Sequence, residues 1–139
     1  IQKINNTTQL NFSLPSTEQW QYAAMGGNKS QSYIYSGSNI PGDVAWYSSN
    51  CSSKQKVKTK TPNELGIYDL SGNVEEFVTN RYSYSSYSFP CFCGGSYLST
   101  SNSITNTSRS NMYDKHGYTS NADNIKDNGI GFRLILTCK

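Results

Sequence analysis

Apolar positions are sparse and unevenly spaced along this sequence, so helices are predicted only near its amino-terminal end, and they are short. Ile1, Ile4 and Leu10 recur with a spacing that predicts the last turns of a helix. From 28 to 50 the apolar residues form a single short cluster between Gly and Pro residues. This segment is therefore predicted to form loops with one brief ordered turn.

A capping-box motif marks the start of a second predicted helix. Ser16 and Gln19 have the S-x-x-Q spacing in which each side chain pairs with the backbone of the other residue. Gly26-Gly27 can end this helix in a left-handed conformation. Trp20 and Ala24 are four residues apart and share one face of the helix, which we expect to face the core.

The rest of the chain shows signals for short strands and loops. Residues 54–60 alternate lysine with other residues, which predicts an extended edge strand with four lysines on one solvated face; a polyanion site is the alternative. Strands are also predicted around 94–98 and 131–136. Between them lie about thirty residues with few aliphatic side chains, where a further strand is predicted around 104–109. The Tyr/Ser tract at 82–88 has no core-forming period and is predicted to be an exposed loop.

These patterns predict an α+β fold that is rich in loops, with short strands and few helices. The length of 139 residues and the mass of 15.5 kDa fit a single domain with one core. Hydrophobic residues make up 35% and charged residues 15% of the chain, against usual values of about 45–50% and about 25%. Ser, Asn, Thr and Tyr fill the difference, so the predicted surface is polar but weakly charged.

Net charge and hydropathy argue against two classes of partner. The net charge of +3 and the isoelectric point of about 8.6 are low for a dedicated nucleic-acid binder, so no nucleic acid is expected as a partner. No apolar run approaches the roughly 18 residues that cross a bilayer. We therefore expect no membrane insertion within this chain.

The cysteines and the histidine limit the possible chemistry. Cys91 and Cys93 form a C-x-C pair without the second pair that structural zinc requires. An even number of cysteines in so polar a chain is typical of an exported protein, which places it outside the cell, on the cell surface or on a virion. One or two disulfides are expected, joining Cys51 or Cys138 to the Cys91/Cys93 region. His116 lies in a polar, loop-like stretch that does not favour a catalytic role.

Three separated motifs carry a family resemblance. They are LPSTEQWQYAAMGG at 14–27, PNELGIYDLSGNVEEF at 62–77, and GGSY at 94–97 with the closing GFR at 131–133. In this order and spacing the chain resembles the formylglycine-generating enzyme (sulfatase-modifying factor) family, whose fold is a variant of the C-type lectin fold. The resemblance implies one domain over 1–139 that lacks the family's first strand and helix. The chain is then expected to associate with an N-terminal fragment or to be part of a larger polypeptide.

The resemblance also argues against the family's oxidase activity. The oxidases bind copper(I) through two cysteines that follow the Gly-Gly-Ser motif, because copper(I) requires soft thiolate ligands. Ser99 and Ile104 occupy the matching positions here, so no catalytic residue and no copper are expected. The alternative is an active copper-dependent oxidase, acting on a substrate cysteine, whose own cysteines are rearranged.

A structural calcium site is a second implication of the resemblance. In the enzymes, one calcium ion is held by a side-chain oxygen, two backbone carbonyls and a closing carboxylate, which correspond here to Asp69, Gly72, Val74 and Glu76. Such oxygen ligands suit calcium. The alternative is that Asp69 caps a turn, Glu76 makes an ordinary surface pair, and the loop closes without metal. Glu75 replaces a Trp that is usual in the family.

Without thiolates, the scaffold is predicted to bind ligands through its polar loops, at about 82–128. Ser, Asn, Thr, Tyr and Asp fill 22 of the 32 positions from 97 to 128, a composition typical of adaptable binding loops. A protein or glycan on a cell or phage-host surface is the expected ligand. The candidate ligand-binding residues are Tyr82, Tyr84, Tyr87, Tyr97, Ser99, Ser101, Asn106, Ser108, Asn111, Tyr113, His116 and Tyr118.

A more specific hypothesis is that segment 97–128 is hypervariable. The chain is similar to the variable proteins of diversity-generating retroelements, which share this fold and end their variable segment near a motif like Ile130-Gly131-Phe132-Arg133. Adenine-directed mutagenesis of asparagine codons does not produce Glu, Gln or Trp, and 97–128 contains none of them. Met112, Lys115 and Lys126 would be fixed by the template. A purely structural domain of a surface appendage is a further alternative.

Overall fold

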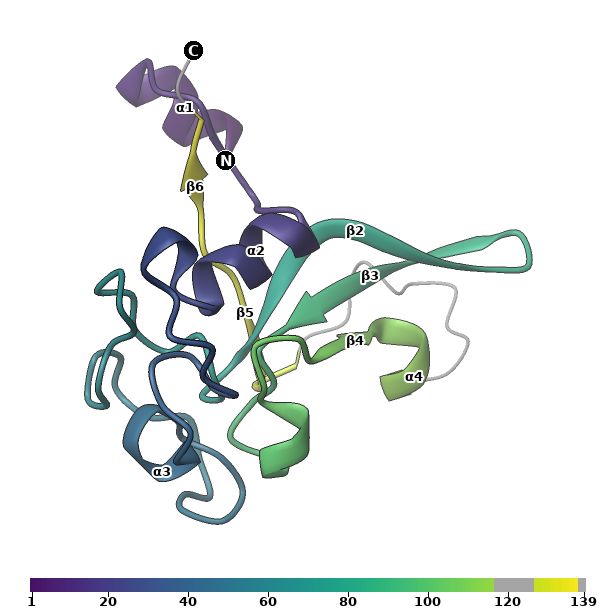
Figure 1. Ribbon diagram of the computed structural model, residues 1–139. Helices are drawn as coiled ribbons and strands as arrows, with labels where there is room; N and C mark the ends of the chain where they lie inside the picture. Colours follow the sequence, from purple (N-terminus) through teal and green to yellow (C-terminus); the bar gives the residue numbers. More distant parts are fainter. Residues whose placement is uncertain (117–126, 138–139) are drawn as a thin grey trace.

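A four-stranded mixed sheet forms the centre of the structure, a computed structural model that describes residues 1–116 and 127–137 (Figure 1). The strand order is β4-β3-β2-β5. β3 runs antiparallel to both β2 and β4, whereas β5 pairs with β2 in parallel. The strands are β2 (Glu75–Tyr84), β3 (Tyr87–Cys93), β4 (Arg109–Asn111) and β5 (Ile130–Gly131).

Helix α2 (Thr17–Ala24) packs on one face of this sheet and confirms the predicted second helix. Ser16 N donates to Gln19 Oε1 at 2.9 Å and Gln19 N donates to Ser16 Oγ at 3.2 Å, so the capping box is formed in both directions. Trp20 and Ala24 are buried as predicted. Their core cluster also contains Leu70, Val78 and Cys93.

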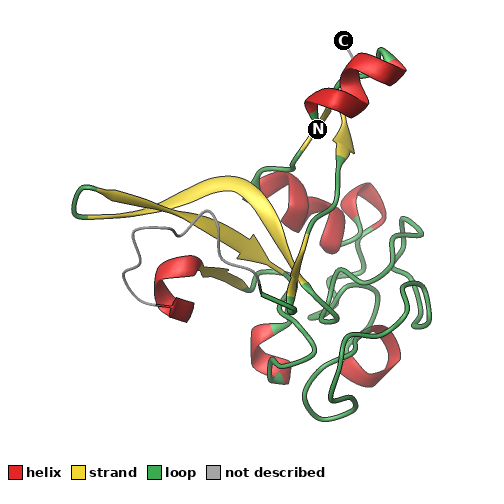
Figure 2. Ribbon diagram, turned by 180° about the vertical axis from the view of Figure 1, so that it is seen from behind, coloured by secondary structure: helices red, strands yellow, loops and turns green. Residues whose placement is uncertain are grey.

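The two ends of the chain meet outside the main sheet. Helix α1 (Gln2–Thr8), strand β1 (Phe12–Ser13) and strand β6 (Ile135–Leu136) stand apart from it (Figures 1 and 2). β1 and β6 pair antiparallel. The Asn5 side chain exchanges two hydrogen bonds with the Phe12 backbone, at 2.9 and 2.8 Å, and this ties α1 to β1. A helix within residues 1–10 is thus confirmed, although none of its residues is buried.

Short helical pieces and loops make up most of the remainder. The 28–50 segment is irregular, as predicted, and packs Tyr35, Val44 and Ala45 around Ile104 in a second core cluster. The α+β class with few, short helices is confirmed. No helix in the described part of the chain is long and apolar enough to cross a membrane. The short pieces are η1 (Gly27–Lys29), α3 (Pro41–Val44), η2 (Ser101–Ser103) and α4 (Met112–His116).

The Tyr/Ser tract at 82–88 is a β-hairpin, so the loop prediction is wrong, although its residues are exposed as predicted. Tyr82 pairs with Phe89, and Tyr84 pairs with Tyr87. Aromatic pairs directly across a ladder stabilise a sheet. Ser85 turns the chain with a φ of 54°. The tract therefore extends β2 and β3 into an arm away from the body (Figure 1).

The predicted edge strand at 54–60 is also wrong, because this segment forms turns. Lys58 has a φ of 63°, which is incompatible with an extended strand. Its backbone N–H donates to Asp69 Oδ2 at 2.9 Å. Two lysines lie over aromatic rings, Lys58 over Tyr68 and Lys60 over Trp46, so the four lysines do not share one face.

The remaining strand predictions are displaced. Residues 94–98 form a turn, because Gly94 and Gly95 have φ values of 90° and 65°, and the strand lies before them in β3. The predicted strand at 131–136 is divided into β5 and β6, which pair with different partners. The strand predicted around 104–109 begins only at Arg109.

The described cysteines are free thiols, which corrects part of the disulfide prediction. Cys51, Cys91 and Cys93 are unpaired, so Cys51 is not joined to the Cys91/Cys93 region. Cys93 instead packs against Trp20 beneath α2, and burial raises the pKa of its thiol to about 12. The alternative pairing through Cys138 lies outside the described residues.

Candidate functional site

A polar pocket of about 330 Å³ opens where the start of β2, helix η2 and strand β4 meet. Hydroxyl, amide and charged side chains dominate its walls. The described residues that line it are Glu75, Gly95, Ser99, Asn102, Ser103, Ser108, Arg109 and Ser110.

Glu75 supplies a nearly buried carboxylate to this pocket, since only 6% of the residue is exposed. Its Oε2 accepts a hydrogen bond from Ser110 Oγ at 2.8 Å and lies 2.9 Å from Lys115 Nζ. The Glu75 backbone N–H donates to Gly129 O at 2.7 Å, where β2 begins beside β5. The carboxylate is therefore fixed in position and compensated by one ammonium group.

The Gly94-Gly95 turn brings helix η2 against the end of β3. A Cβ atom on Gly95 would lie 2.4 Å from the carbonyl oxygen of Ser103, so only glycine allows this approach. Of the two residues predicted to match the family's copper positions, Ser99 lines the pocket and its Oγ accepts from Ser96 N at 3.0 Å. Ile104 is fully buried in the second core cluster.

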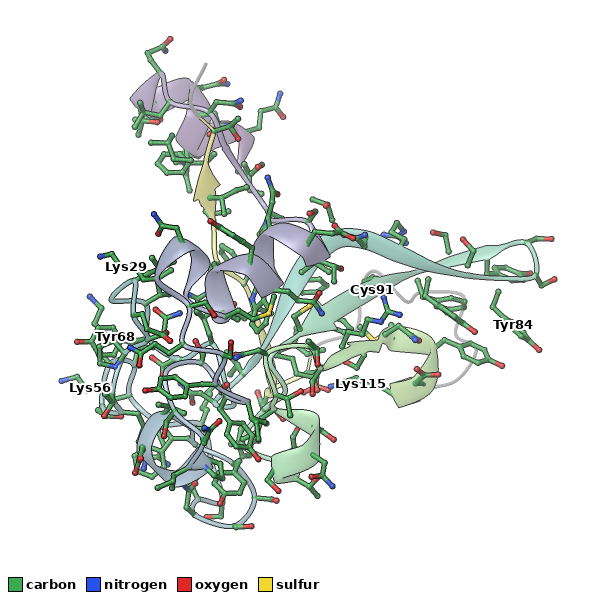
Figure 3. The ribbon with its side chains drawn as sticks, in the orientation of Figure 1. Lys29, Lys56, Tyr68, Tyr84, Cys91 and Lys115 are labelled. Atoms are coloured by element: carbon green, nitrogen blue, oxygen red, sulfur yellow. The ribbon has the colours of Figure 1, made fainter. Side chains whose placement is uncertain are left out.

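Tyrosines of the hairpin arm stack on helix α4, the helix whose Lys115 contacts Glu75. The rings of Tyr84 and Tyr113 are stacked with their centroids 4.7 Å apart, and Tyr82 lies 6.0 Å from Tyr113. The hydrogen bond with Tyr84 raises the pKa of Tyr113. Tyr84 remains 50% exposed and therefore offers ring surface to solvent. Figure 3 shows Tyr84 on the arm and Lys115 on α4.

The structure distributes the sequence-predicted ligand residues over the pocket, the hairpin arm and helix α4. Ser99 and Ser108 line the pocket, while Ser101 and Tyr97 are half-buried beside it along the chain. Asn106 is a correction: it is 3% exposed, and its Nδ2 donates to Tyr33 O, so it supports the loop instead of facing ligands. Three of the others, Tyr82, Tyr84 and Tyr87, lie on the hairpin.

The last predicted residues lie on or after α4. Asn111 Nδ2 donates to Asp114 Oδ2 at 2.6 Å and its Oδ1 accepts from Asp114 N, which starts the short helix. Tyr113 belongs to the tyrosine stack, and His116 is the last residue of α4. Tyr118 lies outside the described residues.

Six polar residues in or next to the pocket are absent from the predicted ligand residues: Glu75, Asn102, Ser103, Arg109, Ser110 and Lys115. Only Glu75 gave a signal, as a departure from the family's Trp. Arg109 and Ser110 reach the site through the register of β3 and β4, in which Phe92 pairs with Ser110 and Cys93 with Arg109. Lys115 reaches Glu75 from helix α4. Such long-range pairing cannot be read from local sequence.

The loop expected to hold calcium is engaged by protein donors. The Glu76 carboxylate accepts hydrogen bonds from the Arg133 guanidinium and from the Trp20 indole N–H, the latter at 2.7 Å. Asp69 accepts from the Lys58 backbone. The two carboxylates of the predicted set therefore already have protein partners, and an ion would have to displace Arg133 from Glu76. Calcium binding thus stays a prediction. The alternative of an ordinary surface pair is corrected, because the Glu76 carboxylate that pairs with Arg133 is buried.

Comparisons with known proteins agree with this architecture. Residues 2–138 match the sulfatase-modifying factor enzyme 1-like domain family. The chaperone protein LppX of Paenibacillus barcinonensis is 41% identical over 52% of this chain and 32% of its own. The inactive C-alpha-formylglycine-generating enzyme 2 of Mus musculus is 30% identical over 86% of this chain and 41% of its own.

Two solved structures are also similar to this chain in fold. Treponema denticola variable protein 1 matches with a TM-score of 0.73 and 28% identity over 90% of this chain and 47% of its own. CarF matches with a TM-score of 0.73 and 31% identity over 92% and 48%. The chain thus spans about half or less of the length of these relatives. Because the family match extends over nearly the whole sequence, the chain belongs to the sulfatase-modifying factor enzyme 1-like domain family.

Proposed function

We propose that this chain is a noncatalytic ligand-binding module, whose recognition surface is the polar, Tyr/Ser/Asn-rich region at about 82–128. The observation that carries this proposal is the pocket beside Gly95. Ser99, which the resemblance aligns with one copper ligand, lines this pocket, and Ile104, which it aligns with the other, is a buried core residue.

The chemistry of the nearby cysteines supports a noncatalytic role. Copper(I) binding requires thiolates. Cys93 packs in the core with its pKa raised to about 12 by burial, so it is a thiol at neutral pH. Cys91 lies two residues away on the same strand, with its pKa also raised by burial. The name of the related mammalian protein, an inactive formylglycine-generating enzyme, agrees with this proposal.

The composition and geometry of the surface support ligand binding. Tyrosine presents rigid contact area at a low entropic cost, and serine and asparagine add adaptable hydrogen bonds. The hairpin arm presents Tyr82, Tyr84 and Tyr87 with 37%, 50% and 47% exposure. Likeness to a protein named variable protein 1 supports the more specific hypothesis of a hypervariable, retroelement-diversified receptor-binding protein. Such a module acts outside the cell, on a cell or virion surface.

Two experiments test this function. Incubation of the chain with copper(I), oxygen and a cysteine-containing sulfatase peptide is expected to leave the peptide unchanged by mass spectrometry, and conversion of the cysteine to formylglycine would refute the proposal. Screening the folded chain against protein and glycan arrays is expected to find a ligand, whereas an appendage domain would bind nothing. A reverse-transcriptase gene beside a near-copy of 97–128 is expected in the genome if the segment is hypervariable.

A further inference from the structure

The pocket beside Glu75 carries charges of both signs. One carboxylate, Glu75, faces two cationic side chains, Lys115 in direct contact and Arg109 on the pocket wall. The other described wall residues are neutral, and apart from Gly95 each carries a hydroxyl or an amide. Serine hydroxyls and asparagine amides both donate and accept hydrogen bonds. The lining is thus rich in donors and acceptors, and its one carboxylate and two cations leave a net charge of only +1.

This lining discriminates among ligand classes. A phosphate or carboxylate ligand would meet the buried Glu75 carboxylate, and an amine or guanidinium would meet Lys115 and Arg109. An apolar ligand would find no apolar wall among the described residues and would leave buried polar groups unpaired. A neutral ligand with several hydroxyl groups matches the donors and acceptors in both directions.

We propose that this pocket binds one sugar residue of a glycan, with Glu75 accepting hydrogen bonds from sugar hydroxyls and Arg109 donating to them. The inference rests on the proposed binding function and names its ligand class. The volume of about 330 Å³ is at the lower end of small-molecule sites, which range over about 300–1,000 Å³. It accommodates a single ring, so the rest of the glycan extends out of the pocket.

The tyrosine stack lies where such an extension can continue. Lys115 Nζ is 5.7 Å from the centroid of the Phe92 ring, and Tyr113 packs 5.4 Å from Phe89. Phe89 and Phe92 belong to one cluster on the sheet face away from α2. Helix α4 therefore carries both Lys115, which contacts Glu75 of the pocket, and the stacked Tyr113. Aromatic faces such as that of the exposed Tyr84 can pack against the apolar face of a second sugar ring.

Titration of the complete chain with the methyl glycosides of glucose, galactose, mannose and N-acetylglucosamine tests this inference. With the chain ¹⁵N-labelled, at least one glycoside is expected to shift the amide signals of Glu75, Ser99 and Ser110 with a Kd of about 1 mM. Two variants report on the pocket. Asn102→Trp fills it from an exposed position, and Glu75→Gln removes the acceptor charge.

Each variant is expected to weaken glycoside binding about tenfold or more. Asn28→Trp, at an exposed position of η1, is the matched control and is expected to bind like the parent chain. If Glu75→Gln fails to fold, Asn102→Trp alone decides the question. Unchanged binding in Asn102→Trp, or amide shifts confined to the hairpin, would overturn the inference.

The array screen separates failure of this inference from failure of the proposed function. If none of the four glycosides shifts the pocket signals but a purified protein ligand binds the tyrosine surface, the binding function stands and the sugar assignment is wrong. If the chain binds neither proteins nor glycans, both are wrong.

Discussion

The guanidinium of Arg133 meets both carboxylate oxygens of Glu76, with Nε 2.5 Å from Oε2 and Nη2 2.7 Å from Oε1. Trp20 Nε1 donates to Oε2 as well, and Arg133 Nη2 also donates to Tyr68 O at 3.0 Å. One buried carboxylate therefore connects helix α2, strand β2 and the chain that follows β5.

Replacing Arg133 by methionine is expected to lower the free energy of unfolding by about 3 kcal/mol, because it leaves Glu76 buried without its counter-charge. The value is at the lower end for such pairs since the Arg133 side chain is 26% exposed. Urea unfolding followed by circular dichroism measures the change. Lys54→Met, at an exposed position, is the control and is expected to stay within about 0.5 kcal/mol. A loss below about 1 kcal/mol in Arg133→Met would contradict the role of the pair.

The calcium prediction has a specific consequence because Arg133 already occupies Glu76. A calcium ion must displace the guanidinium to bind this carboxylate, so calcium is expected to raise the Tm of Arg133→Met more than that of the parent chain. Adding Asp69→Asn to that variant should abolish the increase, since a carboxylate ligand is lost. Differential scanning calorimetry with calcium or with chelator measures the effect. No calcium-dependent Tm change in either protein would show that the loop closes without metal.

Local signals predicted the helical part of the fold correctly. The capping box at Ser16 and Gln19 depends on residues three apart, and the burial of Trp20 and Ala24 follows from the helical period. The same reasoning failed for the Tyr/Ser tract. Tyr82 and Tyr84 before Ser85-Ser86, and Tyr87 and Phe89 after it, alternate with serine in the period of two that is typical of strands, and these residues pair across the hairpin. The polar composition of the tract hid this signal.

The candidate site was predictable only where the family motifs cover it. The Gly94-Gly95 turn and Ser99 follow from the resemblance, and both border the pocket. Ser110 and Lys115 converge on Glu75 through the register of three strands and a short helix, across 35 and 40 residues of sequence. The prediction that Asn106 faces ligands fails for a related reason. Its side chain and its backbone N–H donate to the carbonyl oxygens of Tyr33 and Ile34, which are distant in sequence, and these bonds hold it in the interior.

The described cysteines are expected to differ in reactivity. Cys91 and Cys51 are partly exposed, whereas Cys93 is 1% exposed beneath Trp20. Iodoacetamide at about pH 8 should therefore modify Cys91 and Cys51 in the native chain and leave Cys93 unmodified, because the thiolate is the reacting form. Peptide mass spectrometry identifies which cysteines are modified. As a control, the same reaction in urea should modify Cys93 as well. Modification of native Cys93 at the rate of Cys91 would contradict its burial.

The raised pKa of Cys93 predicts a loss of stability in alkali. The unfolded thiol ionises near 9.0 and the folded thiol near about 12, so the folded state retains a proton that the unfolded state releases. This contribution is complete below pH 9.0 and is lost as the pH rises toward about 12. Urea unfolding across this range is expected to show a smaller decline for Cys93→Val, which cannot ionise. Parallel curves for the two proteins would be inconsistent with a protonated buried thiol.

Gly95→Ala is expected to destabilise the fold and disturb the pocket together. The new methyl group would lie 2.4 Å from Ser103 O and 2.7 Å from Ile104 Cγ2, at a backbone φ of 65°. The clash and the left-handed conformation both disfavour alanine, and together they are expected to lower the free energy of unfolding by about 2 kcal/mol or more.

Gly42→Ala, in helix α3, is the matched control. No heavy atom beyond its chain neighbours lies within 4 Å of the added Cβ, so this substitution is expected to be neutral or slightly stabilising. Urea unfolding measures both. Equal effects of the two substitutions would mean that η2 does not pack against the glycine turn, and the pocket wall formed by Ser99 and Ser103 would then need another explanation.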